Sequence, residues 1–315
     1  MFRILATTAA LALLTACGDG QPFEFGVVTP VDPPLTPDEI EAQAAIAKSI
    51  AGDLDGGTYS SVDGTMTVQI TLDAQGPVSA EYTRNPALDV DGYIAFSQQD
   101  DPLDRIFIAM GARSADNSVE GVLAMDGGQA NRFFGGTTFR QIGPYAEPAP
   151  TSGLVSYAGD YVGLSNLNAT SNLIGLPPIN PATDPALLPL QASRVTGQIF
   201  INADFTDNAI NGLIVNRTNI DRNESLADLA LIVTNIDADG RFLGTVEVVG
   251  AIEIKIGDYG GTFGGTGASG IAGGVHLDGD YIPNVEKEQE FGIFVLTQCG
   301  LAGDAAICDG VQPEF

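Results

Sequence analysis

The clearest pattern in the chain is a series of short segments in which apolar and polar residues alternate. Beyond residue 153, eight such segments can be counted, and tight-turn residues such as Thr206-Asp207-Asn208 separate several of them. They span residues 154–164, 195–205, 209–216, 226–235, 242–249, 257–265, 271–277 and 290–297. Eight antiparallel strands suffice to close a barrel, and closure removes exposed sheet edges. Because a barrel of this size fills its interior with side chains, we expect ligands at its rim and loops.

A smaller region of alternating segments precedes the barrel, between residues 57 and 143. Thr65–Thr71 is one of its segments. The proline-rich stretch 145–152 that follows is the best domain boundary in the chain. The barrel is therefore assigned to residues 153–299, with a C-terminal tail at 300–315. The predicted fold is all-β: an eight-stranded antiparallel barrel after a small β region and one short N-terminal helix.

That helix is predicted over residues 37–51. Thr36 is a suitable N-cap, with Pro37 at the first helical position and Glu39 completing a capping box. Apolar residues recur at helical spacing up to Ile50, and Gly52 ends the pattern. The helix either packs on the body or acts as a spacer, and no chemistry is assigned to it.

The N-terminus has the features of an export signal. After Arg3, an apolar run of about eleven residues ends in Leu14-Thr15-Ala16-Cys17, and it is too short to span a bilayer. The sequence predicts a lipoprotein signal peptide at 1–16, lipidation of Cys17 and a flexible Pro- and Gly-rich tether at 17–36. The alternative is an ordinary signal peptide with an incidental cysteine. Gly18 in place of Asp favours the outer membrane.

Two further cysteines, Cys299 and Cys308, lie close together near the C-terminus. An exported chain meets an oxidising compartment, so a disulfide between them is expected. A metal-binding pair is the alternative, but no further cysteine or nearby histidine is present to complete a site.

The charge is strongly acidic, with 40 Asp and Glu against 13 Lys and Arg and a formal net charge of −27. Nucleic acid and anionic lipid surfaces repel such a chain, so no nucleic-acid partner is expected. The acidity either keeps the protein soluble or attracts a basic protein or a cation.

The most suggestive surface is the long connection at 165–190, between the first two barrel strands. Loops of this length are commonly functional or disordered. Its candidate partner-contact residues are Leu173, Ile174, Leu176, Ile179, Leu187 and Leu188. The apolar, Pro-rich connection either contacts a partner or folds back over the barrel end as a plug.

Motifs that carry chemistry are largely missing. His276 is the only histidine, and no Gly-x-Ser-x-Gly element accompanies it. Residues 235–240 have the opening spacing of a calcium loop, but the twelfth position is Val246 and strands flank the segment, so a hairpin turn is predicted. We expect no catalytic residue, no metal site and no cofactor.

Two segments of the barrel region, Ala203–Gly212 and Phe263–Gly273, resemble elements of a known family. The first is similar to the recurrent strand-turn-strand element, and the second to the glycine-containing signature, of the transferrin-binding protein B-like β-barrel domain. The chain departs from that signature at Gly264, Thr266 and Gly270, and the resemblance covers about residues 153–299, a single lobe. It implies a surface lipoprotein of Gram-negative bacteria with a β "handle" beside a barrel, whose members bind host or nutrient proteins.

The predicted function is therefore a lipid-anchored outer-membrane protein, exposed at the cell surface, that binds a protein or an iron- or haem-bearing ligand. In this prediction residues 57–143 form the handle, and the protein is not an enzyme. The alternative is a periplasm-facing structural lipoprotein of the envelope with no nutrient ligand.

Overall fold

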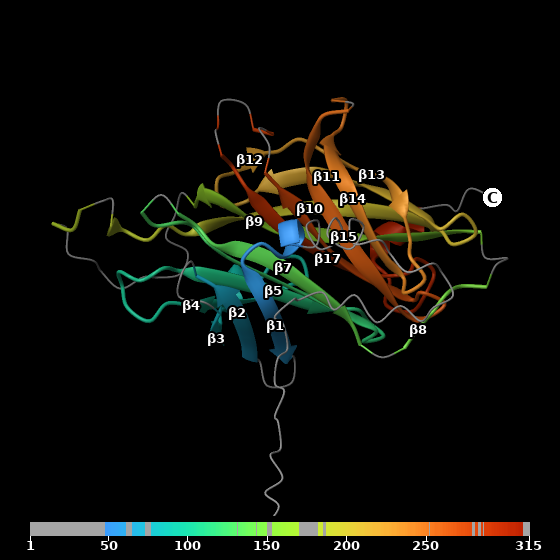
Figure 1. Ribbon diagram of the computed structural model, residues 1–315, viewed down its shortest axis with the longest axis horizontal. Coiled ribbons are helices and arrows are strands. Elements are labelled where there is room, and N and C mark those ends of the chain that lie inside the picture. Colours follow the sequence, from blue (N-terminus) through green and yellow to red (C-terminus); the bar gives the residue numbers. More distant parts are fainter. Residues whose placement is uncertain are drawn as a thin grey trace, which may run out of the picture.

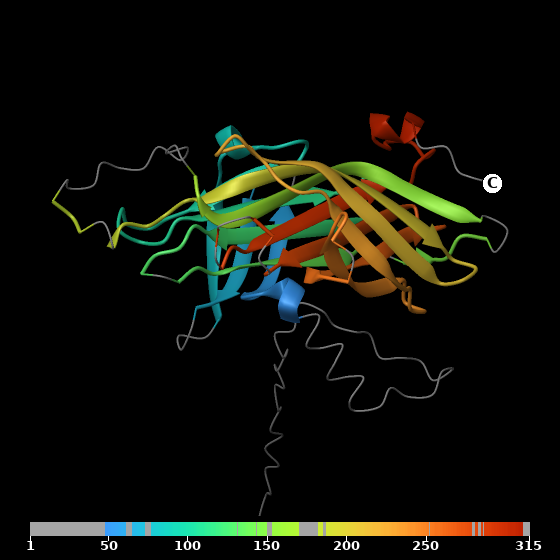
Figure 2. The ribbon, with the colours of Figure 1, turned by 90° about the horizontal axis from the view of Figure 1, so that it is seen from above.

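The computed structural model describes residues 48–60, 65–72, 77–130, 132–142, 144–149, 153–169, 182–184, 187–251, 253–278, 281–282, 285 and 287–310. Its strands form two antiparallel sheets, one of seven strands and one that closes into a barrel. Figures 1 and 2 show the seven-stranded sheet (blue to green), here called the handle, lying along one side of the barrel (yellow-green to red). The predicted all-β architecture is confirmed.

All eight predicted barrel segments form strands. They are β9 (Leu154–Asn168), β10 (Ala192–Asp204), β11 (Ala209–Asn219), β13 (Leu229–Asn235), β14 (Arg241–Val248), β15 (Lys255–Thr266), β16 (Gly270–Leu277) and β17 (Glu290–Thr297). Each pairs with its sequence neighbour, and β9 pairs with both β10 and β17 to close the barrel. Two-residue strands accompany them: β8 (Tyr145–Ala146) runs parallel to β15, and β12 (Glu224–Ser225) lies beside β11.

The handle is a simple meander in which each strand pairs with the next. Its strands are β1 (Leu54–Ser60), β2 (Thr65–Thr71), β3 (Pro77–Arg84), β4 (Ile94–Gln98), β5 (Phe107–Arg113), β6 (Val119–Asp126) and β7 (Gly135–Gln141), with a short 3-10 helix, η2 (Pro86–Leu88), after β3. Alternation places Met66, Val68 and Ile70 of β2 inside the sheet's own core. The Asp53 N–H donates to the Gly135 carbonyl at 2.9 Å and so brings the two ends of the meander together.

The handle and the barrel share a core. Strand β6 is buried along its whole length, because its two faces have different partners. Val122 and Ala124 face the handle's interior, whereas Leu123 and Met125 pack with barrel residues that include Phe291. The two sheets are therefore joined by apolar packing as well as by the chain that connects them.

Glycines of β15 and β16 allow this close packing. A Cβ on Gly264 would lie 2.6 Å from the Ser118 carbonyl of the handle, and a Cβ on Gly273 would lie 2.3 Å from the Phe294 ring inside the barrel. The glycine-rich stretch is therefore explained by close approach on both of its faces, as expected for glycines in strand interiors.

The barrel interior is filled with side chains, as predicted. Phe263 is fully buried in it, with ring centroids 5.5 Å from Tyr157, 5.0 Å from Phe205 and 5.5 Å from Phe242. Aliphatic residues of all eight strands complete this cluster. The lumen of the barrel is thus a core, and binding surfaces have to be sought outside it.

Two smaller predictions fall on described residues. Cys299 and Cys308 form a disulfide, which closes a loop ending in a 3-10 helix, η4 (Ala306–Gly310). Of the helix predicted over 37–51, residues 48–51 are described and helical, and Ile50 is fully buried between handle and barrel. That turn packs on the body. Among the described residues, no helix has the length and apolar character needed to cross a bilayer.

Candidate functional site

The barrel seam between β9 and β17 is interrupted. The two strands pair from Glu290 opposite Ser165 to Phe294 opposite Tyr161, and they meet again at the Tyr157–Gln298 bridge in the same register. Residues 158–160 and 295–297 lie between these points without forming the ladder. Both stretches line a pocket at the junction of handle and barrel, called here the junction pocket.

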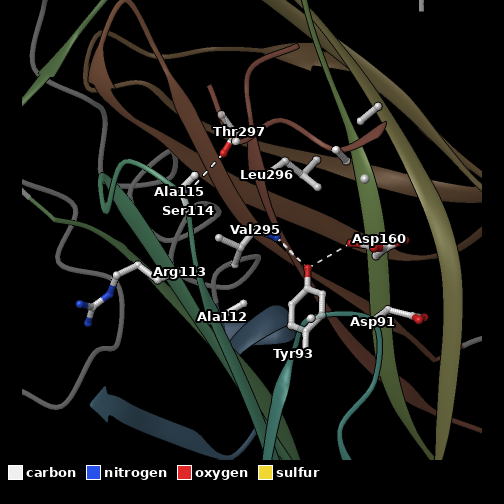
Figure 3. A pocket seen from close by; sticks show the side chains of 15 residues that line it. Asp91, Tyr93, Ala112, Arg113, Ser114, Ala115, Asp160, Val295, Leu296 and Thr297 are labelled. Carbon is white, nitrogen blue, oxygen red and sulfur yellow. Dashed lines mark hydrogen bonds between the residues drawn. The ribbon is translucent and has the colours of Figure 1, made fainter. Parts of the chain in front are cut away.

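A tyrosine of the handle is inserted into this interruption. The Tyr93 hydroxyl donates to the Asp160 carbonyl at 3.0 Å and accepts the Val295 N–H at 2.9 Å, as Figure 3 shows. It therefore bridges two backbone groups that would otherwise face each other across the seam. Burial raises the pKa of Tyr93, with a smaller opposing effect of the Val295 hydrogen bond, so the hydroxyl stays protonated and able to donate.

A tight turn positions Tyr93. Val90 and Tyr93 form two mutual backbone hydrogen bonds, and the residues between them, Asp91 and Gly92, have φ of +46° and +83°. Positive φ at both central residues defines a type I′ turn, for which Asp-Gly is a favoured pair. The dipeptide Asp91-Gly92 is a sequence signal for this turn. Neither residue is among the site residues predicted from the sequence.

The junction pocket has a volume of about 260 Å³. Its walls come from the 91–93 turn, the end of β5, strands β9 and β17, and the disulfide-closed loop. The loop wall fits closely, since a Cβ on Gly303 would lie 2.4 Å from the Ala115 Cβ. The disulfide therefore holds one wall of the pocket against the handle.

The charge of the junction pocket is negative. Asp91 and Asp160 line it and are both exposed, and Figure 3 shows them on the same side of Tyr93. Arg113 is the only cationic residue of the lining, and its guanidinium points away, where it binds Glu120 at 2.5 Å. Burial raises the pKa of Asp160, and the charge of Asp91 raises it further.

This raised pKa predicts that Asp160→Asn stabilises the protein at neutral pH. A carboxyl group whose pKa is higher in the folded than in the unfolded state loses folding stability as pH rises from the ordinary aspartate value through the raised one. The variant should therefore have a higher Tm than the parent at pH 7 and no advantage at about pH 3, where the carboxyl group is protonated in both states. Thermal unfolding at the two pH values measures this.

Asp207→Asn, at an exposed turn, is the control and should leave the Tm unchanged at both pH values. A parent that is as stable as Asp160→Asn at pH 7, or more stable, contradicts the prediction.

A second candidate surface lies where three connections converge. The Gln129 side-chain amide donates to the Leu103 carbonyl at 2.7 Å and to the Leu187 carbonyl at 2.8 Å, so it joins the β4–β5, β6–β7 and β9–β10 connections. The Leu190 N–H donates to the Gly128 carbonyl, and its own carbonyl accepts the Gly127 N–H. In Figures 1 and 2 these connections extend from the same end of the molecule.

Exposed leucines surround this point. Leu103, Leu187 and Leu190 are 41%, 56% and 41% exposed. Leu190 lines a depression with a volume of about 560 Å³, called here the loop groove. Leu103 and Leu187 are joined to this groove through Gln129, which also lines it. The lining of the groove includes Phe133, Leu188 and Leu190, the cationic residues Arg132 and Lys287, and no acidic residue.

The predicted partner-contact connection is thus partly described. Strands β9 and β10 are longer than predicted, so the connection shortens to residues 169–191. Leu187 and Leu188 are described and lie near the handle, where the Leu187 carbonyl accepts the Gln129 amide. Leu173, Ile174, Leu176, Ile179 and the predicted lipidation site Cys17 lie outside the described residues.

The other residues singled out in the sequence have local roles. His276 stacks on Phe291 with ring centroids 4.2 Å apart, and burial lowers its pKa. Asp237 accepts the backbone N–H groups of Asp239 and Arg241, which confirms the predicted hairpin turn. Tyr145, in the predicted domain boundary, pairs with Gly265 of β15.

No protein-family model and no curated protein matches the sequence. Similar solved structures include transferrin binding protein B from Haemophilus parasuis Hp5, as a double mutant, with 9% identity and a TM-score of 0.38 over 75% of this chain and 51% of that one. The isotype 1 protein from serogroup B Neisseria meningitidis has 13% identity and a TM-score of 0.31 over 78% and 53%. This chain spans about half the length of both.

A DUF3598-family protein of unknown function from Nostoc punctiforme is also similar, with 9% identity and a TM-score of 0.23 over 78% of this chain and 87% of that one. Function is not transferable at this level of similarity.

Proposed function

We propose that this protein is a lipid-anchored binding module of the outer membrane that holds a protein partner at the loop groove and has no catalytic activity. The observation that carries the proposal is the set of exposed leucines fixed around Gln129. The Gln129 hydrogen bonds hold the backbone that carries Leu103 and Leu187, so this backbone loses little conformational entropy on binding, which favours association.

The partner's chemistry follows from the groove. Phe133, Leu188 and Leu190 offer apolar contacts, and Arg132 and Lys287 place positive charge among them. A partner with an apolar segment bordered by acidic groups is complementary to this surface, and proteins that carry iron or haem are within this class. Because the barrel interior is a packed core, a ligand inside the barrel is not part of the proposal.

Site-specific photo-crosslinking in cells tests the contact surface. A photoreactive residue is introduced at Leu103 or Leu187, and at Val249 as a control with a matching exposure of 51% on the β14–β15 turn. A discrete adduct heavier than the monomer, formed from positions 103 and 187 but not from 249, is expected. Equal adducts from all three positions, no adduct, or an adduct of twice the chain's mass overturns the proposal of a separate protein partner.

Protease treatment of intact cells tests the proposed location. Loss of the mature protein from intact cells, with a periplasmic protein left undigested, is the expected result. Protection in intact cells and digestion after permeabilisation overturns surface exposure, and then the structural role at the periplasmic face replaces capture of an external ligand.

A further inference from the structure

The junction pocket is a second candidate binding site, separate from the loop groove and different from it in charge. The two sites lie at different positions along β9, since residues 158–160 line the pocket and Asn166 lines the groove. The pocket exists because the β9–β17 ladder is interrupted and Tyr93 is inserted in the gap. The handle keeps the two strands apart through the hydrogen bonds of Tyr93, so the interruption is a specific feature of the fold.

The lining of the pocket suits an aliphatic group. Seven of its fifteen lining residues are glycine or alanine, among them Gly159 and Ala158 on β9 and Ala305 on the disulfide loop. Val295 and Leu296 of β17 add larger apolar side chains. An aliphatic stem makes van der Waals contacts with walls of this kind.

The charge of the pocket selects a cation. Asp91 and Asp160 line the junction pocket, whereas the guanidinium of Arg113 binds Glu120 outside it. Asp91 stands at the first central position of the type I′ turn, with φ of +46°, a position for which Asp is favoured.

A metal ion fits the pocket less well than an organic cation. Calcium takes six to eight oxygen ligands, and no group of three or more His, Cys, Asp or Glu side chains in the described part of the chain is arranged to hold a metal. Two carboxylates beside the apolar side chains of Val295 and Leu296 instead match a guanidinium or ammonium group at the end of an aliphatic stem.

We propose that the junction pocket binds a guanidinium or ammonium group carried on an aliphatic stem, as in an arginine or lysine side chain. The stem lies in the pocket beside Tyr93, and the cationic group pairs with Asp91 and Asp160. The raised pKa of Asp160 agrees with this assignment, because a bound cation relieves the repulsion between the two carboxylates.

The test uses the purified protein and two small probes, a Gly-Arg-Gly peptide and its Gly-citrulline-Gly analogue. Citrulline has the shape of arginine without its charge, so the pair isolates the cation. The arginine peptide should shift the amide resonances of Tyr93, Asp160 and Val295, and it should bind about tenfold more tightly than the citrulline peptide. Its affinity should fall at high salt.

Variants locate the binding. Asp91→Asn and Asp160→Asn should each lower the affinity for the arginine peptide about fivefold, because each removes one charge-assisted contact. Asn is favoured at positive φ, so Asp91→Asn preserves the turn. Asp207→Asn, on the β10–β11 turn, should leave binding unchanged. Free arginine amide as a third probe distinguishes a small-molecule site, which binds it as well as the peptide, from a site for a protein side chain, which binds the peptide better.

Three results overturn the proposal. They are equal binding of the arginine and citrulline peptides, binding that neither aspartate variant weakens, and displacement of the arginine peptide by an equimolar amount of calcium. The assay needs no protein partner, so it can fail while crosslinking at the loop groove succeeds, and the reverse also holds.

Discussion

Replacing Arg217 with Leu is expected to lower the free energy of unfolding by about 3–5 kcal/mol, the range for breaking a buried ion pair from one side. Arg217 on β11 and Glu290 on β17 have fully buried side chains, and their Nη2 and Oε2 atoms are 2.6 Å apart. The second Glu290 oxygen accepts the Tyr161 hydroxyl at 2.7 Å. The variant leaves a buried carboxylate with that hydroxyl as its remaining side-chain partner, so its charge is no longer compensated. Denaturant-induced unfolding at neutral pH measures the loss.

The chain supplies a matched control on the turn after the same strand. Arg222 pairs with Glu224 at 3.0 Å, but the two side chains are 28% and 44% exposed. Arg222→Leu should therefore lower the free energy of unfolding by less than about 1 kcal/mol. If Arg217→Leu lowers the free energy of unfolding no more than Arg222→Leu does, then Glu290 is not a buried carboxylate whose charge Arg217 compensates.

A double variant separates the ion pair from the space it fills. Arg217→Met combined with Glu290→Leu replaces both charges with apolar side chains and should recover most of the stability lost in the single variant. A double variant as unstable as Arg217→Leu attributes the loss to packing and contradicts the electrostatic account. Burial lowers the pKa of Arg217, but Glu290 more than offsets this, so the guanidinium stays charged in the native barrel.

The strands, turns and disulfide were predictable because each leaves a local signal. Alternation with a period of two marked all eight barrel strands, and polar turn residues marked their hairpins. The spacing of Cys299 and Cys308 sufficed to predict their bond. In these cases the residues that interact are close in sequence, or the pattern belongs to a single strand.

The junction of handle and barrel left no such signal. A strand such as β6, buried on both faces, has the same sequence pattern whatever covers its second face. Arg217 and Glu290 are 73 residues apart, and Tyr93 lies 202 residues from Val295, so neither contact follows from spacing. The junction pocket is made of five segments that only the closed barrel brings together, and sequence reasoning therefore found the loop but not the pocket.

Tyr93→Phe is expected to lower the free energy of unfolding by about 1–3 kcal/mol, although it removes a single oxygen atom. The ring remains, so the packing of the handle on the barrel is kept. The lost hydroxyl leaves the Val295 N–H without its acceptor and the Asp160 carbonyl without its donor, in a seam where the two strands no longer pair with each other. Denaturant unfolding measures the change, and hydrogen exchange at the Val295 amide should become faster.

Tyr145→Phe is the matched control for this substitution. The Tyr145 hydroxyl is also buried, but it has no hydrogen-bond partner among the described residues, so its removal should be neutral or stabilising. The contrast between the two Tyr→Phe variants isolates the hydrogen bonds from the general effect of removing a buried hydroxyl. Equal stabilities would mean that Tyr93 contributes only its ring to the junction.

Tyr93→Phe also distinguishes a shaped site from a pair of surface charges. The variant leaves Asp91 and Asp160 in the chain, yet it frees the part of β9 that carries Asp160 from the handle. If the junction pocket depends on its geometry, the arginine peptide should bind more weakly to this variant at unchanged charge, because the two carboxylates are no longer held in position for one cation. Unchanged affinity would mean that the two charges alone attract the peptide and that the shape of the junction pocket does not contribute.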